Sequence, residues 1–203
     1  MIRIALRTAA LAAVAGLSAC SLLSSPDPVQ LYRFGGTQAS ARPATSGAPV
    51  EIALRRIEFA DAVSGERLLG VTGTEAAYIA GARWVSSARD LFTDSLEGAF
   101  VSGSSRVRLL GQREITPGNQ TLDIDVRTFE ARYAAKGAAP TVVVIARARL
   151  LNRDRTIDAE EVFESSIPAG ANRVGSIVDA FDAATAAVTS DIVDWTEANA
   201  GEN

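Results

Sequence analysis

Three long segments in the second half of the chain alternate between apolar and polar residues, and they constrain the fold more than any other feature. They cover residues 121–133, 141–151 and 156–167. A period of two places one side of a strand on a core and the other side toward solvent. Because short loops separate the segments, we expect an antiparallel meander. The middle segment is apolar on both sides in its first half, which predicts a central strand.

The first of these segments changes phase part-way along. Its apolar residues occupy even positions and then odd ones: Leu122, Ile124, Val126, Phe129, Ala131 and Tyr133. One extra residue in a strand has this effect, so the pattern predicts a β-bulge near Arg127 and Thr128. In the third segment the residues expected to face the core are Ile157, Ala159, Phe163 and Ile167.

Two other segments have the spacing of helices. Residues 88–100 repeat apolar side chains at three- and four-residue steps, after Ser87 with Asp90 three positions later, which is a variant of the capping box. Gly103 is expected to end this helix. Residues 172–199 have the same periodicity over a longer stretch, which predicts a long C-terminal helix.

Shorter strands are predicted at 29–34, 50–59 and 106–110, and a strand at 75–85 with a kink or tight turn at Gly81. Together the pattern predicts one α+β domain over residues 29–203. In this domain a mostly antiparallel sheet packs against one mid-chain helix and one long C-terminal helix. The stretch 35–49 is built from Gly, Ala, Ser, Thr and Pro and is expected to be a flexible loop, because it has little to bury.

The N-terminus has the composition of an export signal. Arg3 and Arg7 precede an uncharged apolar stretch, and Leu17-Ser18-Ala19 then leads to Cys20. The apolar stretch is shorter than the about 20 residues that a spanning helix needs. We therefore expect a cleaved signal peptide at 1–19.

Cys20 is the only cysteine of the chain, so it cannot form an internal disulfide. It follows the small residues of a bacterial lipobox, which predicts that Cys20 is lipidated and becomes the mature N-terminus. Residues 20–28 would then be a lipidated tether between the membrane and the domain. The alternatives are an ordinary secretory signal with a coincidental cysteine, or an uncleaved anchor.

The residue inventory leaves little room for catalysis. The chain contains no histidine, which removes the commonest general base and metal ligand. Its formal net charge of −4 argues against nucleic acid or an anionic membrane surface as the general partner, but it decides nothing about local patches. We expect no enzyme activity, no catalytic residue, no cofactor and no metal site.

The sequence contains one candidate carboxylate pair. Asp123 and Asp125 lie two residues apart on a strand, so they share a face. The favoured interpretation is that they occupy the solvent side of that strand and have no catalytic or calcium-binding role.

Tyr78, Arg83 and Trp84 form the candidate partner-binding cluster. Tyrosine, tryptophan and arginine are enriched at interface hot spots. The alternative is that Tyr78 and Trp84 pack in the core and Arg83 is exposed. The sequence leaves both interpretations open.

The order of these features resembles the ABC-type transport auxiliary lipoprotein family, whose best-known members are similar to paraquat-inducible protein C. The resemblance rests on the lipobox, the strands at 31–34 and 50–59, and Tyr78…Arg83-Trp84 before the apolar helix. Residues 60–70 depart from the family pattern, which leaves the strand register there open.

The resemblance implies a non-catalytic accessory of an MCE-type lipid-transport system. Its partners would be the MCE protein of an ABC transporter, the membrane through its lipid anchor, and further copies of itself. Ser21 is not the aspartate that marks inner-membrane retention in enteric bacteria. The outer membrane is therefore favoured, with the domain facing the periplasm, over the periplasmic leaflet of the inner membrane. The competing hypothesis is a structural or envelope-assembly lipoprotein unrelated to lipid transport.

Overall fold

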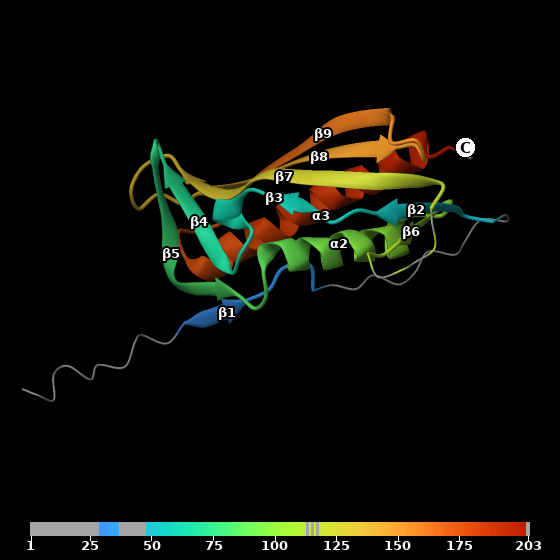
Figure 1. Cartoon of the computed structure of the whole chain (residues 1–203). Helices are drawn as coiled ribbons and strands as arrows, with labels where there is room; N and C mark the ends of the chain where they lie inside the picture. Colours follow the sequence, from blue (N-terminus) through green and yellow to red (C-terminus); the bar gives the residue numbers. More distant parts are fainter. Residues whose placement is uncertain (1–28, 37–47, 113, 115, 117, 202–203) are drawn as a thin grey trace, which may run out of the picture.

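The computed structural model describes residues 29–36, 48–112, 114, 116 and 118–201. Three long strands form its centre: β7 (Gln120–Tyr133), β8 (Thr141–Leu151) and β9 (Ile157–Pro168). They pair antiparallel in chain order, which confirms the predicted meander, and β8 lies between the other two (Figure 1). The register shifts between Val126 and Thr128, so the predicted bulge is present.

The other edge of β7 is shared by three short strands. β2 (Val50–Leu54), β3 (Glu58–Phe59) and β4 (Arg67–Thr72) each pair with β7 in parallel, at successive positions along it. The predicted strand at 50–59 is therefore two strands, and β4 was not predicted.

The remaining strands extend this side of the sheet. β6 (Val107–Leu110) runs parallel to β2, and β5 (Glu75–Trp84) runs antiparallel to β4. β1 (Gln30–Tyr32) adds to β5 in parallel. The α+β class is confirmed, but the sheet is mixed rather than mostly antiparallel: five of the eight strand pairings in the described chain are parallel. Alternation assigns faces to a strand and says nothing about the direction of its neighbour.

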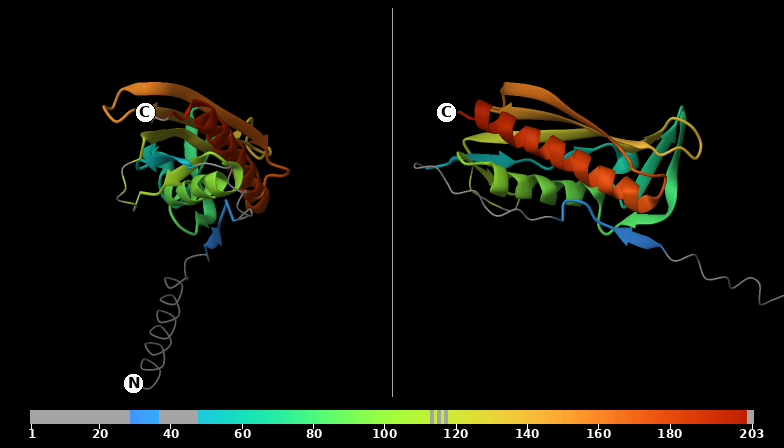
Figure 2. Two further views of the ribbon diagram at one scale, coloured as in Figure 1. Left: turned by 90° about the vertical axis from the view of Figure 1, so that its right-hand side faces the viewer. Right: turned by 180° about the vertical axis from the view of Figure 1, so that it is seen from behind.

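Two helices cover one face of the sheet. α2 (Ala88–Gly103) begins after Ser87, whose hydroxyl accepts a hydrogen bond from the Asp90 N–H at 3.1 Å, as the sequence predicts. α3 (Val174–Asn199) crosses the sheet diagonally and packs on β8, β9 and α2 (Figure 2). A short 3-10 turn, Asp61–Val63, precedes β4.

Aromatic side chains join these layers into one core. Phe129 of β7 contacts Phe181 of α3, with ring centroids 4.8 Å apart, and Phe59 of β3, at 5.8 Å. Phe59 in turn contacts Phe92 of α2 at 5.7 Å. Because one buried ring of β7 links the sheet to both helices, the sheet and the helices share a single hydrophobic core.

Strand β9 is covered less than predicted. Phe163 is buried, as expected, but Ile157 is exposed. β9 pairs only with β8 among the described strands, and the register of this pair shifts between Leu150, opposite Ala159, and Leu151, opposite Ile157, which interrupts the alternation at the start of β9. The expected signal peptide at 1–19, the tether at 20–28 and most of the expected loop at 35–49 lie outside the described residues.

Candidate functional site

Trp84 lies in the core, so it cannot belong to an exposed partner surface. It is 1% exposed, and its ring contacts Phe34 at 5.0 Å and Phe181 at 5.3 Å. The core-packing interpretation therefore holds for this residue. Strand alternation explains it, because Ala82 and Trp84 share the inner side of β5 while Arg83 lies on the outer side.

Tyr78 lies on the part of β5 that pairs with β4. Its side chain is 37% exposed. The hydroxyl donates a hydrogen bond to the Ala62 carbonyl at 3.1 Å, and the Arg67 guanidinium lies 3.7 Å from the ring centroid. The ring is thus held in place by two polar contacts and still presents an open edge to solvent.

Arg83 lies on the other part of β5, beyond the bend. Its side chain is 50% exposed and forms an ion pair with Glu66 at 3.6 Å. Its strand neighbours are Leu31 of β1 and Arg67 of β4. Tyr78 and Arg83 therefore share a strand and both reach solvent.

Gly81 creates the bend that separates these two parts of β5. Its φ is +69°, a left-handed conformation that favours glycine. The register between β4 and β5 shifts in the same place, between Arg67 and Leu69. After the bend, β5 turns along β1, as Figure 1 shows at the corner beside β1. The kink predicted at Gly81 is confirmed.

The large exposed apolar residues gather near this bend. Four of the seven in the described chain lie on β1, on β5 or directly beside them, and the other three are scattered over α2 and β9: Val29, Leu31, Tyr78, Val85, Val101, Ile157 and Val162. Sequence reasoning singled out Tyr78 but missed Leu31 and Val85. Alternation could have identified them, because Leu31 is next to the inward-facing Tyr32 and Val85 is next to the inward-facing Trp84.

The carboxylate pair on β7 is part of an ion-pair network. Asp123 accepts a hydrogen bond from the Arg149 guanidinium and lies 3.6 Å from that of Arg55. Asp125 forms ion pairs with Arg127 at 3.0 Å and Arg147 at 3.3 Å.

The predicted side of the strand is correct, but Asp123 is only 4% exposed because the arginines of β8 and of the β2–β3 connection cover it. A carboxylate neutralised in this way has a structural role. In the described chain no group of three or more Asp, Glu, Cys or His side chains is placed to hold a metal ion.

Glu197, near the end of α3, has a pKa below its usual value. Partial burial opposes its ionisation, but hydrogen bonds from the Arg106 N–H, the Ser104 hydroxyl and the Ser105 N–H outweigh that effect and lower the pKa. The Oε1 atom accepts from Ser104 at 2.7 Å and from the Arg106 N–H at 2.8 Å. Through these hydrogen bonds the carboxylate holds the turn between α2 and β6 against the end of α3.

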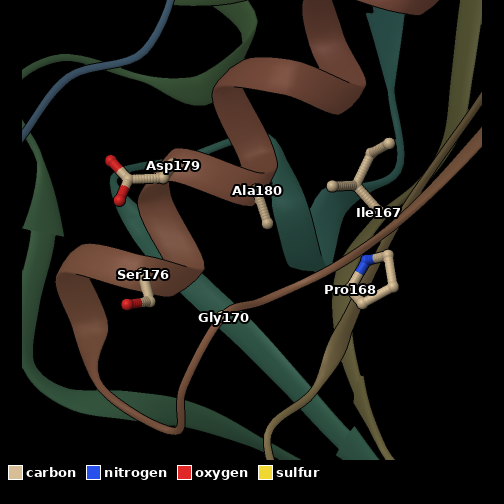
Figure 3. A pocket seen from close by; sticks show the side chains of 6 residues that line it. All are labelled: Ile167, Pro168, Gly170, Ser176, Asp179 and Ala180. Carbon is tan, nitrogen blue, oxygen red and sulfur yellow. The ribbon is translucent and has the colours of Figure 1, made fainter.

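A small cavity of about 220 Å³ lies between the end of β9 and the start of α3. Figure 3 shows Ile167 and Pro168 on its strand side, and Asp179 on the helix side pointing away from them. Ser176 accepts a hydrogen bond from the Arg173 guanidinium at 2.8 Å. The cavity therefore presents no nucleophile paired with a base.

A wider groove of about 1330 Å³ runs between α2 and α3, beside the chain that follows β1. Acidic side chains line it on both helices: Asp94, Glu97, Asp182 and Asp194. Asp182 accepts a hydrogen bond from the Gly35 N–H at 2.6 Å, which holds the chain that follows β1 against α3. None of the helices in the described part of the chain is both long enough and apolar enough to cross a bilayer.

The sequence profile of the family of ABC-type transport auxiliary lipoprotein components matches residues 32–193, which is most of the chain. The chain belongs to this family. Family membership places this auxiliary lipoprotein with an ABC-type transporter and in the membrane-anchored part of the cell envelope. No curated protein matches the chain.

Solved structures support the fold of this auxiliary lipoprotein. A protein from Xanthomonas campestris is similar with a TM-score of 0.69 and 23% identity, over 84% of this chain and 96% of that one. An uncharacterised protein has a TM-score of 0.63 and 14% identity, over 83% and 98%. A hypothetical protein from Chlamydia trachomatis has 0.51 and 14%, over 77% and 100%. At these identities the similarity concerns the fold alone.

Proposed function

We propose that this auxiliary lipoprotein is a non-catalytic, lipid-anchored component of an ABC/MCE-type lipid-transport system, and that it docks the periplasm-spanning MCE protein at the outer membrane. The observation that carries the proposal is the family match over residues 32–193, in a chain whose residues 17–20 have the pattern of a lipobox. The chain has no histidine, and the two carboxylates of β7 form ion pairs with arginines of β8. Both facts agree with a role in binding rather than catalysis.

The anchor in this proposal is Cys20. Each buried methylene of an acyl chain contributes about 0.8 kcal/mol, and a single chain gives only marginal attachment, so durable anchoring requires more than one chain. Mass spectrometry of the protein purified from membranes tests this step. We expect the mature chain to begin at Cys20 and to carry the added mass of a diacylglyceryl group and an N-acyl chain such as palmitate.

Replacing Cys20 by Ala should release a folded domain from the membrane fraction and abolish its support of the transport system. A chain that begins upstream of Cys20 with a free thiol would contradict the anchor. Full transport activity of a released Cys20→Ala protein would contradict the need for it.

The docking contact we propose comprises Tyr78 and Arg83, since both reach solvent on β5. Aromatic and arginine side chains held in a fixed geometry lose little conformational entropy on binding, which suits a hot spot. Trp84 supports this contact from below and does not touch the partner.

Co-purification with the MCE protein tests the docking proposal. The gene is expected beside those for an ABC permease, its ATPase and an MCE protein, and a tagged chain should retain the MCE protein. Tyr78→Ala and Arg83→Ala should reduce the amount retained, while Ile157→Ala, an exposed apolar residue of β9, should leave it unchanged. If the unaltered chain retains no MCE protein, the transport role is wrong and an envelope-assembly role becomes the better hypothesis.

The same proposal includes a homo-oligomer and an outer-membrane location. Light scattering of the purified mature protein measures its mass, and an oligomer should exceed the mass of one chain. Density-gradient separation of the two membranes should place the protein with the outer membrane, as Ser21 predicts. Replacing Ser21 by Asp should move it toward the inner membrane in enteric bacteria.

A further inference from the structure

We propose that the outer face of the β1–β5 strand pair rests against the bilayer surface that holds the anchor. The apolar part of this membrane face comprises Val29, Leu31 and Val85, and Arg33 supplies its charge, while Arg83 lies at its border with the proposed docking contact. The inference rests on the proposed lipidation of Cys20 and adds to it an orientation of the domain on the membrane.

Strand register places these side chains on one face. Leu31 is the direct neighbour of Arg83, and Tyr32 is the neighbour of Trp84. Tyr32 and Trp84 point toward the core, so Leu31 and Arg83 point to the opposite side. Leu31 is 53% exposed and Val85 is 45% exposed, and the Val85 N–H donates to the Tyr32 carbonyl at 2.8 Å. The exposed aliphatic groups of β1 and of the end of β5 are therefore adjacent.

The length of the tether brings this end of the domain to the membrane. Residues 21–28 are eight residues long, and at about 3.3 Å per residue they span at most about 26 Å. Helix α3 alone has 26 residues, which at about 1.5 Å per residue makes it about 39 Å long. Figures 1 and 2 show β1 and the bend of β5 at one end of the molecule and the C-terminus at the other. The tether therefore holds the β1 end near the bilayer and leaves the C-terminal end to extend away from it.

Charge favours a lipid surface as the occupant. The chain has a formal net charge of −4, yet Arg33 lies on the membrane face and Arg83 and Arg67 lie at its border, where Glu66, the ion-pair partner of Arg83, offsets one of the positive charges. Arginine beside exposed aliphatic groups is suited to the headgroup region of a bilayer with anionic lipids, where the guanidinium pairs with phosphate and the aliphatic groups enter the interface. Ile157 and Val162 on β9 are equally exposed, but they lie among Asp158, Glu160 and Glu164. Ile157 and Val162 therefore serve as controls for the residues of the membrane face.

Two labels on adjacent residues test the membrane face. Leu31→Cys and Gln30→Cys each add one thiol to a chain whose own Cys20 is blocked as a thioether, so a fluorophore attaches at one position. The tether holds residues 30 and 31 equally close to the bilayer, and only their side chains point to different faces of β1. In vesicles of phosphatidylethanolamine and phosphatidylglycerol with nitroxide-labelled lipid, we expect several-fold stronger quenching of the label at 31. Equal quenching at both positions, or stronger quenching at 30, overturns the proposal.

A second measurement does not depend on lipidation. Purified mature chain with Cys20→Ser is mixed with the same vesicles and sedimented. We expect this chain to bind, and we expect Leu31→Glu to weaken the binding by about tenfold. The substitution replaces an aliphatic group that would enter the bilayer interface with a charge that anionic lipid repels. Ile157→Glu is the matched control, since Ile157 is 55% exposed, and it should bind like the unaltered chain. Equal binding of the two variants, or no vesicle binding by the unaltered chain, overturns the membrane face.

The outcomes separate this proposal from the proposed function. An unmodified Cys20 in the mass spectrum contradicts the anchor, whatever the vesicles show. If Leu31→Glu abolishes retention of the MCE protein and leaves vesicle binding unchanged, the surface binds a protein partner and the membrane face is wrong. Melting temperatures of Leu31→Glu and Ile157→Glu close to that of the unaltered chain establish that the variants are folded.

Discussion

The meander and the β1–β5 end differ in how the side chains on their outer faces find partners. On the meander, Asp123 and Asp125 of β7 face Arg149 and Arg147 of β8, so the charges pair with each other across the strands. At the β1–β5 end, Leu31, Tyr78 and Val85 present apolar surface to solvent. Opposite charges on directly paired strands stabilise the β7–β8 pair, whereas the exposed aliphatic groups at the bend of β5 have no such cross-strand partner of opposite character among the described strands. This difference is the reason why the proposed contacts with partners are placed at the β1–β5 end and not on the meander.

The largest expected effect comes from the residue that joins these two regions. Trp84→Ala should lower the free energy of unfolding by about 3–5 kcal/mol, because it leaves a large cavity among Phe34, Phe129 and Phe181. Chemical denaturation measures this loss. Trp84→Phe is the control and should lose clearly less. A Trp84→Ala protein as stable as the unaltered chain would contradict the core role of Trp84.

The next prediction compares the two kinds of ion pair. Asp123→Ala should lower stability by about 1.5–3 kcal/mol, because it removes the acceptor that Arg149 and Arg55 share on a covered face. Glu66→Ala breaks the pair with Arg83, whose two side chains are 50% and 54% exposed, and should cost at most about 1 kcal/mol. Denaturant midpoints measured for both variants should rank in this order. Equal losses would mean that the charges of the meander are no better paired than Glu66 and Arg83.

The bend of β5 gives a third comparison. Gly81→Ala should lower stability by about 1–2 kcal/mol, because a side chain at φ +69° is strained even though no atom lies close to the new methyl group. Gly65→Ala is the control, since that glycine also has open space but no positive φ. Thermal unfolding of the pair measures the difference. If the two variants melt together, the conformation at Gly81 does not need glycine.

Glu197, near the C-terminal end of α3, makes the free energy of unfolding depend on pH. Its pKa in the folded protein lies below the ordinary glutamate value of 4.5, so its contribution is fully present above that pH and is lost as the pH falls through the lowered pKa. Glu197→Gln should cost about 0.5–1.5 kcal/mol at neutral pH. Melting temperatures of the two proteins should converge in acid. A difference that grows as the pH falls would show that the carboxylate is not the stabilising form.

The smallest stability change is expected at the proposed docking contact. Tyr78→Ala should cost only about 0.5–1 kcal/mol, which is the value of a partly exposed contact between arginine and an aromatic ring. Its effect should appear instead in the retention of the MCE protein. Tyr78→Phe, which keeps the ring and loses only the hydrogen bond to Ala62, should retain the partner. A Tyr78→Ala protein that unfolds would make Tyr78 part of the core and not of the surface.

Local sequence patterns predicted the elements whose signal is local. Ser87 and Asp90 located the start of α2, and the phase change around Arg127 located the bulge in β7. Gly81 was correctly expected to kink its strand. β4 was missed, because Gly70 interrupts its apolar pattern. Ile157 was placed in the core because the alternation of β9 does not reveal the register shift between Leu150 and Leu151, after which Ile157 is exposed.

Pairing partners and exposure required the tertiary structure. Trp84 and Tyr78 have similar chemistry and lie close together in the sequence, yet one is at the centre of the core and the other reaches solvent. The bend between them decides this, since it changes which neighbours each part of β5 meets. Likewise, nothing in the spacing of Asp123 indicated that Arg149 and Arg55 would cover it.

The sequence by itself determined the α+β class, the meander, both helices and the family, because periodicity, capping residues and motif order are properties of neighbouring residues. Only the tertiary structure decided that β2, β3 and β4 share one edge of β7 in parallel, that Trp84 is core, and that Leu31 lies beside Arg83. These facts depend on contacts between residues far apart in the chain. Such contacts are selected by the packing of the whole domain, and no local pattern records them.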